Sequence, residues 1–324
     1  MSIELLKKTK LNSNIIEGNN IKRYNPFNIT EDFYIELNEN NTPKLLIYFN
    51  KKLDKIMKLP IHSGCSLPRS GLLVCNSLSD LVVNKKVLDI GTGYTGLIAH
   101  YSSLYGASKV IGTDIDDNVL KVCKTNETKN VKFIKSNVFD KINEKFDVII
   151  SNPPQLPMSY GPIHDVGGKD GRDIINKIIE NKDLIDEAYI MVQKEVGERI
   201  CAKSGKERGI LTLAVEYYGE AEYLFTIPRE FFNPIPNVDS AFISIKFYKD
   251  DRYKNKISED LFFKYVKAAF SNKRKNIVNN LATLGYSKDK IKEILNQIEV
   301  SENERAENIS IDKFIELINI FESR

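Results

Sequence analysis

Short apolar runs alternate with amphipathic stretches through the middle of the chain. The runs are rich in valine and isoleucine, the pattern of strands that are buried on both faces. They lie at 86–90, 109–113, 131–134, 146–150 and 188–192. Because such strands pair in parallel when helices separate them, we predict a doubly wound α/β sheet with helices on both sides.

Helical periodicity fills most of the segments between these strands. The expected helices are 95–105, 117–126, 172–180 and one that begins at Lys194. Two later β segments, 211–218 and 241–247, are expected to finish the sheet as a hairpin-like edge. A polar linker, 248–258, then leads to amphipathic helices without any strand pattern.

These patterns divide the chain into three predicted parts. Residues 1–60 are polar and rich in asparagine, with apolar pieces such as 45–49, and we expect a small strand and a helix cap there. An α/β domain is predicted over 61–250, and a small helical domain over 251–324.

Composition narrows the class of protein. Of 324 residues, 42% are hydrophobic and 28% charged, which is ordinary for a soluble globular chain. A net charge of +3 is too weak for a protein that merely coats nucleic acid, so any RNA contact must come from local patches. No stretch is long and apolar enough to span a membrane, and the N-terminus lacks the apolar core of a signal peptide.

Cysteine and histidine usage points to the same class. The four cysteines are scattered without a CxxC pair, which favours reduced thiols in a cytoplasmic protein. The three histidines are far apart in the sequence and show no ligand spacing. We therefore expect no metal site.

The first predicted strand runs into a glycine turn that contains Gly91 and Gly93. Glycines at a strand-to-helix turn let the backbone approach a ligand closely, beside the free N–H groups of the helix. Dinucleotide enzymes use the same turn, and Gly96 stands where their third glycine would fall. Asp89, just before the turn, can hold the cationic end of methionine and favours S-adenosylmethionine as the cofactor.

Two further polar residues are candidates for the same cofactor. Asp114, at the end of the second strand, is placed to accept both ribose hydroxyls. The alternative is a helix cap, for which Asp116 and Asp117 are better placed. Asn137, after the third strand, is a candidate for the adenine edge, unless it only makes a turn. Ile115 or Phe139 would pack against the adenine face.

The fourth strand ends in Asn152-Pro153-Pro154. Exocyclic amines and amides are poor nucleophiles, because the nitrogen lone pair is delocalised. The Asn152 side-chain oxygen and the Pro153 carbonyl can each accept one N–H and aim the lone pair at a methyl donor. The prolines make the turn rigid. The alternative is a simple turn at the end of a strand, which these residues also favour.

The first half, over roughly 61–180, resembles the class I methyltransferases whose fourth motif reads (D/N/S)PP(Y/F/W). This group includes the release-factor glutamine methyltransferases, and the glycine-rich segment 167–173 is similar to theirs. One departure is Gln155, which stands where an aromatic residue normally stacks on the acceptor. An aromatic stack on a base is worth ~1–3 kcal/mol, and Tyr160 or Phe232 would have to supply the ring.

From about residue 183, the chain resembles the small-subunit ribosomal RNA adenine dimethyltransferases. The matching runs include LIDEAYIMVQKEVGERICAKSG, FFNPIPNVDSAFISI, LFFKYVKAAFSNKRKNIVNNL and RAENISIDKF. The resemblance implies a Rossmann-like fold, and a loop at the active site with Phe232 against the target adenine. Pro234, Pro236 and Ser240 belong to the same loop.

The resemblance also implies that the tail docks on ribosomal RNA. Lys273-Arg274-Lys275, which follows an aromatic-rich helix, is the candidate for binding phosphates. The alternative is a solvated helix end above a buried aromatic face. The aromatic residues of that helix, such as Phe262 and Tyr265, are expected in the core.

The first half departs from the dimethyltransferase pattern. A G-Q-(N/H)-F-L opening is absent, the fourth motif would read N-L-P-(Y/F), and the acid of the second strand is Asp114 rather than glutamate. The chain therefore looks like a hybrid, joined between the fourth strand and the helix after it.

The predicted reaction is S-adenosylmethionine-dependent methylation of adenine N6 in small-subunit ribosomal RNA. The expected enzyme is monomeric and makes no membrane contact. One alternative is an N-methyltransferase of a protein glutamine amide or a small molecule, which Gln155 favours. Another is a ribosome-assembly factor that binds RNA without turnover, against which the intact donor residues argue.

Overall fold

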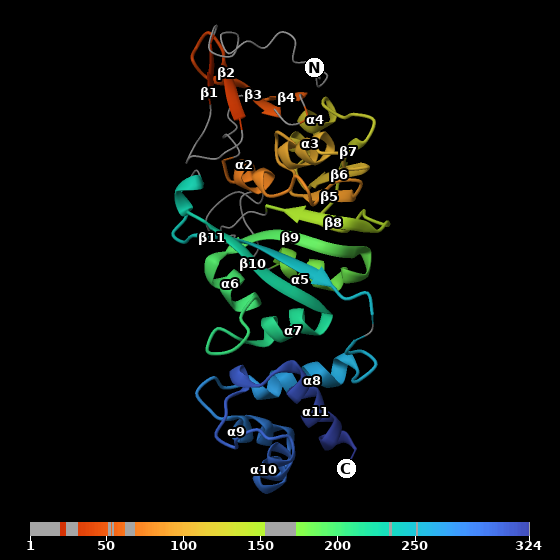
Figure 1. Cartoon of the computed structure of the whole chain (residues 1–324), viewed down its shortest axis with the longest axis vertical. Helices are drawn as coiled ribbons and strands as arrows, with labels where there is room; N and C mark the ends of the chain where they lie inside the picture. Colours follow the sequence, from red (N-terminus) through yellow and green to blue (C-terminus); the bar gives the residue numbers. More distant parts are fainter. Residues whose placement is uncertain are drawn as a thin grey trace. The chain divides into compact units, whose positions relative to one another are not determined.

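Figure 1 shows the computed structural model of the chain, with two sheets and a helical C-terminal region. It describes residues 20–23, 32–50, 53, 55–61, 69–152, 173–232, 235–250 and 252–323. Two compact units are present: the described residues up to Gln193 with Thr226–Phe242, and Lys194–Phe225 with those from Ile243 onward.

The larger sheet has seven strands in the order β10-β11-β9-β8-β5-β6-β7. They are β5 (Lys86–Ile90), β6 (Lys109–Asp114), β7 (Val131–Lys135), β8 (Phe146–Ser151), β9 (Ile185–Gln193), β10 (Gly219–Ile227) and β11 (Ser240–Phe247). The five strands from β5 to β9 pair in parallel. This confirms the predicted doubly wound sheet, whose central strands β5 and β8 are buried on both faces.

Four helices belong to the first unit. The α2 helix (Arg69–Asn76) precedes β5, whereas α3 (Leu97–Leu104), α4 (Asp117–Lys124) and α5 (Asp173–Glu180) follow strands of the larger sheet. The α4 helix begins where predicted because the Asp116 side chain accepts a hydrogen bond from the Asn118 N–H at 2.8 Å. All residues of α3 except Ser103 are buried, so this helix belongs to the core.

The N-terminal part differs from the expected strand and helix cap. Its described residues form a four-stranded antiparallel sheet in the order β1-β2-β3-β4. The strands are β1 (Ile21–Arg23), β2 (Asp32–Leu37), β3 (Pro43–Asn50) and β4 (Lys55–Pro60). Tyr48 of β3 packs on Tyr101 of α3 at 5.2 Å between ring centroids, and its hydroxyl hydrogen bonds with that of Tyr105.

The predicted strand 211–218 is wrong, because it is the helix α7 (Ile210–Tyr218). An apolar run of this length fits a buried helix as well as a buried strand. Thr212 decides for the helix: its Oγ1 accepts from the Gly209 N–H at 3.0 Å and donates to the Arg199 carbonyl. The segment that follows α7 forms the edge strand β10, which pairs with β11. The predicted two-stranded edge is therefore present, but its first strand is 219–227 rather than 211–218.

The second unit contains the predicted helical tail. Its other helices are α6 (Lys194–Ile200), α8 (Glu259–Ala269), α9 (Ile277–Leu281), α10 (Lys288–Gln297) and α11 (Ile311–Glu322). Phe262 and Tyr265 of α8 are buried, as predicted, and Phe262 stacks on Tyr217 at 4.8 Å between ring centroids. In the described part of the chain, no helix combines the length and apolar character needed to cross a membrane.

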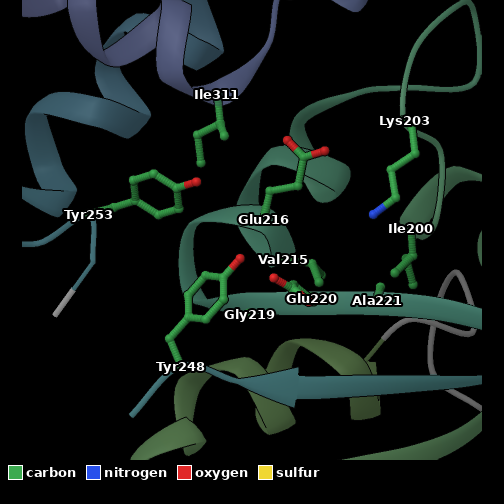
Figure 2. A pocket seen from close by; sticks show the side chains of 10 residues that line it. All are labelled: Ile200, Lys203, Val215, Glu216, Gly219, Glu220, Ala221, Tyr248, Tyr253 and Ile311. Atoms are coloured by element: carbon green, nitrogen blue, oxygen red, sulfur yellow. The ribbon is translucent and has the colours of Figure 1, made fainter. Parts of the chain in front are cut away.

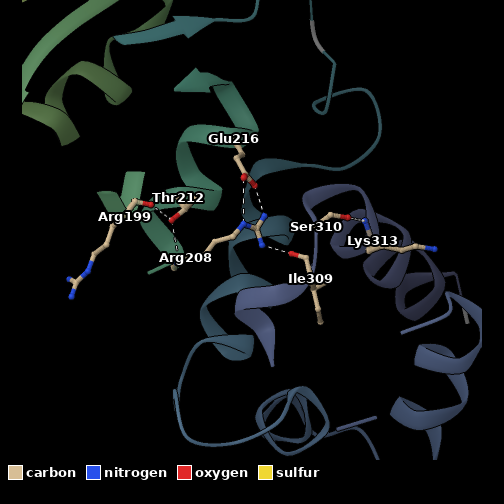
Figure 3. Close-up of polar contacts among 8 residues, drawn as sticks. Arg199, Arg208, Thr212, Glu216, Ile309, Ser310 and Lys313 are labelled. Carbon is tan, nitrogen blue, oxygen red and sulfur yellow. Dashed lines mark hydrogen bonds and ion pairs between the residues drawn. The ribbon is translucent and has the colours of Figure 1, made fainter. Parts of the chain in front are cut away.

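A buried arginine ties this unit together (Figure 3). Arg208 is only 2% exposed, and its guanidinium forms a two-pronged ion pair with Glu216 of α7. It also donates to the carbonyl of Ile309, which precedes α11. One side chain therefore joins segments about a hundred residues apart in the sequence.

Arg208→Met is expected to lower the free energy of unfolding by about 3–5 kcal/mol, because it leaves a poorly solvated carboxylate and a carbonyl without their donor. Arg305, whose ion pair with Glu307 is exposed on the arginine side, provides the matched control. Arg305→Met should cost less than about 1 kcal/mol. Urea denaturation of both variants measures the difference, and equal losses would contradict a special role for Arg208.

Candidate functional site

The turn between β5 and α3 is built around glycines in the left-handed region. The φ angles of Gly91 and Gly93 are +72° and +65°, which other residues adopt only with strain. At both positions, the direction in which a side chain would point is open. The N–H groups of Gly91 and Thr92 both donate to the Thr113 carbonyl at 2.9 Å, which holds the turn against β6. The turn therefore offers a rigid, uncovered stretch of backbone.

Asp89 lies beneath this turn with its side chain fully buried. Its Oδ2 accepts a hydrogen bond from the Thr92 hydroxyl at 2.6 Å, while Oδ1 has no hydrogen-bond partner among the described residues. Burial raises the pKa of Asp89 from 3.8 to about 7, although the Thr92 hydroxyl and the nearby Ala99 backbone N–H oppose the shift. A cation beside this carboxylate would satisfy Oδ1 and offset the cost of burial.

Asp114 closes the same turn from the end of β6. Its Oδ2 accepts from the Gly93 N–H at 3.1 Å, and its Oδ1 accepts from the Asp116 N–H at 3.0 Å. Burial raises the pKa of Asp114, and these backbone hydrogen bonds oppose the shift. The helix cap is Asp116, so the alternative role of Asp114 as a cap is wrong. Each carboxylate oxygen keeps a further lone pair for a hydroxyl ligand.

Asn137 is exposed on the segment that follows β7. Its carbonyl accepts from the Asp140 N–H at 3.3 Å, so it also takes part in a turn. Of the two apolar residues proposed beside it, Ile115 is 42% exposed and Phe139 only 7%. Ile115, directly after Asp114, is therefore the one available to pack against a ligand.

Asn152 directly follows β8, whose last residue Ser151 is paired with Ile90 of β5. This register places Asn152 at the carboxyl-terminal edge of the sheet, the edge at which the glycine turn also lies. The Asn152 side chain is half-buried, and its Nδ2 donates to the Ser70 hydroxyl of α2 at 3.1 Å. Ser70 was not recognised from the sequence, since nothing in the motif around Asn152 indicates a partner 82 residues earlier.

Several residues of the predicted acceptor site lie outside the described residues. These are Pro153, Pro154, Gln155, Tyr160 and Pro234, together with the glycine-rich segment 167–172. Their predicted roles stay predictions.

Phe232 follows the short helix η6 (Arg229–Phe231) and is half-buried, whereas Phe231 points into the core. The loop is held at its base by a hydrogen bond from the Arg229 N–H to Asp239 at 3.1 Å. No hydrogen bond or ring contact among the described residues links Phe232 to the glycine turn or to Asn152. Ser240, from the same predicted loop, is buried at the start of β11.

Lys273, Arg274 and Lys275 belong to the second unit. They lie on the turn between α8 and α9 rather than on a helix, and all three are exposed. The Asn272 side chain accepts from the Arg274 N–H at 3.0 Å and shapes this turn. The triplet is therefore a solvent-facing basic patch.

The second unit also contains a cavity of about 170 Å³ (Figure 2). Lys203 and Tyr253 lie on opposite sides of it, and none of the predicted site residues lines it. Its two carboxylates, Glu216 and Glu220, already form ion pairs with Arg208 and Arg252. The cavity thus offers no unneutralised acid to a ligand. Among the described residues, no group of three or more His, Cys, Asp or Glu could hold a metal ion.

The structure brings Asp89, Gly91, Gly93 and Asp114 together and places Asn152 on the same edge of the sheet. The partnerless Oδ1 of Asp89 suits the ammonium group of S-adenosylmethionine, and the open glycine turn leaves room for its chain. Asp114 suits the ribose. The residues present therefore fit the predicted cofactor.

Comparison with known sequences gives a consistent result. The family described as "Ribosomal RNA adenine dimethylase" matches residues 77–323. "Ribosomal RNA small subunit methyltransferase A" of Fusobacterium nucleatum is 65% identical over 255 residues, covering 76% of this chain and 90% of the relative. The protein of the same name from Clostridioides difficile is 32% identical over 294 residues, covering 85% and 96%.

Solved structures support the fold. A dimethyladenosine transferase from Plasmodium falciparum has a TM-score of 0.60 at 23% identity, covering 78% of this chain and 96% of that one. The 23S rRNA methyltransferase ErmE has a TM-score of 0.56 at 16% identity, covering 76% and 96%. Because the family match spans both halves, this chain belongs to the ribosomal RNA adenine dimethylase family of class I, S-adenosylmethionine-dependent methyltransferases.

Proposed function

We propose that this protein methylates adenine N6 in small-subunit ribosomal RNA. The observation that carries the proposal is the position of Asn152. It follows β8 at the same edge of the sheet as the glycine turn, and Ser70 holds its side chain there. The name and 65% identity of the Fusobacterium relative support the substrate.

The donor side of the site binds by charge and hydrogen bonding. Asp89 would face the ammonium group, Asp114 the ribose hydroxyls and Asn137 the adenine edge, while Ile115 would cover the adenine face. The cofactor, when bound, supplies an electrophilic methyl group. Holding it in one orientation converts an encounter between two molecules into a reaction within one complex.

The acceptor side aims the lone pair of the amine. Asn152 Oδ1 would accept one N–H of the target amine, and the Pro153 carbonyl the other, so that the nitrogen becomes tetrahedral and its lone pair points at the methyl group. The hydrogen-bonded protons become acidic as the nitrogen gains positive charge, and one of them leaves to solvent. Phe232 would stack on the base, which such contacts hold by ~1–3 kcal/mol.

The second unit would contribute RNA binding through Lys273, Arg274 and Lys275. We also propose that the three predicted parts, 1–60, 61–250 and 251–324, are an extension, a catalytic domain and an RNA-docking domain. We propose further that the enzyme is a monomer and acts in the cytoplasm. Its first half would be of the type that carries the Asn-Pro-Pro motif.

Asn152→Ala is expected to lower methyl transfer to small-subunit RNA by roughly 10²-fold or more, because one positioned hydrogen-bonding group at the reacting atom is lost. Transfer from labelled S-adenosylmethionine to RNA and protein pools of the same cell measures this effect. Asn319→Ala, at an exposed position on α11, is the control. Label that appears only in protein would favour the glutamine-amide alternative, and cofactor binding without any transfer would favour a non-enzymatic factor.

The affinity for S-adenosylmethionine is expected to rise with pH up to about 7, by at most about tenfold per pH unit. The pKa of Asp89 is raised to about 7, so the carboxyl is neutral below this pH and cannot neutralise the ammonium group. Calorimetric titration across this range should show proton release on binding. Asp89→Asn should weaken binding and flatten its pH dependence.

The same shift predicts the pH dependence of folding. Since the folded state keeps the Asp89 proton up to about pH 7 and the unfolded chain loses it near 3.8, the apoprotein loses stability as pH rises between these values. Asp89→Asn should remove this loss, whereas Asp140→Asn, at an exposed position, should not.

For the affinity prediction, a wild-type affinity for the cofactor that does not change with pH would contradict the assignment of Asp89.

Replacing Lys273, Arg274 and Lys275 with glutamine should weaken binding to small-subunit RNA and flatten its salt dependence. Each lost phosphate contact removes roughly 0.7–0.9 from the slope of log K against log salt. Filter binding between low and moderate salt measures the slope.

The control for this patch replaces three exposed lysines of the same unit, Lys249, Lys254 and Lys264, with glutamine. It removes the same charge without touching the turn between α8 and α9. An equal change of slope in the control would show that binding follows net charge alone.

A further inference from the structure

We propose that Ser70 is a positioning residue, which orients the Asn152 amide so that its oxygen faces the amine to be methylated. This inference rests on the function proposed above and concerns the same site. In the structure, Asn152 Nδ2 donates a hydrogen bond to Ser70 Oγ at 3.1 Å.

An asparagine side chain has two faces of similar shape and opposite hydrogen-bonding character. One end, Oδ1, accepts hydrogen bonds, and the other, Nδ2, only donates them. An amine bound for methylation presents N–H groups and needs an acceptor. An amide turned by 180° would meet these N–H groups with its own N–H groups and would repel them. The reaction therefore depends on which end of Asn152 faces the acceptor.

In the structure, Ser70 holds the productive orientation by accepting a hydrogen bond from Nδ2. With Nδ2 directed at the Ser70 hydroxyl, the opposite end of the same planar group is Oδ1. The hydrogen bond thus leaves Oδ1 on the side away from α2. The half-buried environment of Asn152 strengthens the preference, because fewer water molecules can substitute for the serine.

The serine itself is held in place by the packing of α2. Ser70 is 9% exposed, and its helix buries Leu72, Val74 and Cys75 in the core. A hydroxyl on the first turn of an anchored helix has little freedom to move, so it can restrain the amide.

The α2 helix ends at Asn76, directly before the part of the chain that matches the adenine dimethylase family. The orienting contact therefore comes from a segment outside the family match. It connects the N-terminal part of this chain to the catalytic strand β8.

The test compares Ser70→Ala with Ser70→Thr in the full-length protein. Loss of the hydroxyl should lower kcat by about tenfold, through loss of orientation, with KM and the affinity for S-adenosylmethionine changed less than about twofold. Ser70→Thr keeps a hydroxyl and should retain most of the activity. Ser77→Ala is the matched control, since the Ser77 hydroxyl donates to the Val74 carbonyl within the same segment.

A double mutant separates positioning from an independent effect. If Ser70 acts through Asn152, Ser70→Ala should cause no further loss of kcat once Asn152 is alanine. Multiplying effects in the double variant, or wild-type kcat in Ser70→Ala, would overturn the proposal. So would a parallel loss of thermal stability and cofactor affinity in Ser70→Ala, which would mark a structural role.

A spectroscopic readout makes the result independent of turnover. In protein labelled with ¹⁵N at asparagine, Ser70→Ala should shift the side-chain amide signal of Asn152, identified by its absence in Asn152→Ala, while Ser77→Ala should not. An unshifted signal would refute the hydrogen bond. Failure of the wild-type protein to methylate RNA would instead refute the proposed function, and the amide signal would still decide the contact.

Discussion

The structure depends on the parallel register of three strands, β5, β6 and β8. Because parallel strands present their carboxyl ends at one edge, residues far apart in the sequence meet there. Ile90 is paired with both Thr113 and Ser151, so the residues that follow the three strands start from the same level. The glycine turn, Asp114 and Asn152 are consequences of this one constraint.

The same edge of the sheet contains the group of the site whose charged form is least favourable, the carboxylate of Asp89. Asp89 is fully buried, and its Oδ1 has no partner among the described residues, so its ionised form is unfavourable in the free protein. A folding core would gain from a neutral residue at this position. A cationic ligand reverses the balance, because it makes the buried carboxylate an attractive partner.

The two units combine different kinds of stabilisation. In the first, apolar strands and the buried helix α3 form a continuous core, on which Tyr48 of the N-terminal sheet packs through Tyr101. In the second, aromatic rings stack around Tyr217, and the buried Arg208 joins α7 to the segment before α11. The basic turn between α8 and α9 is exposed on this second unit.

The sequence by itself determined the parallel sheet, the glycine turn, the start of α4 at Asp117 and the helical tail. These features follow from local patterns: apolar runs, positive-φ glycines and short-range hydrogen bonds. Only the tertiary structure decided that 211–218 is helical, that the described residues before 61 form an antiparallel sheet, that Asp89 is buried and that Ser70 holds Asn152. An apolar run fits either a helix or a strand, and strand pairing, burial and contacts across 82 residues exist only once the chain has folded.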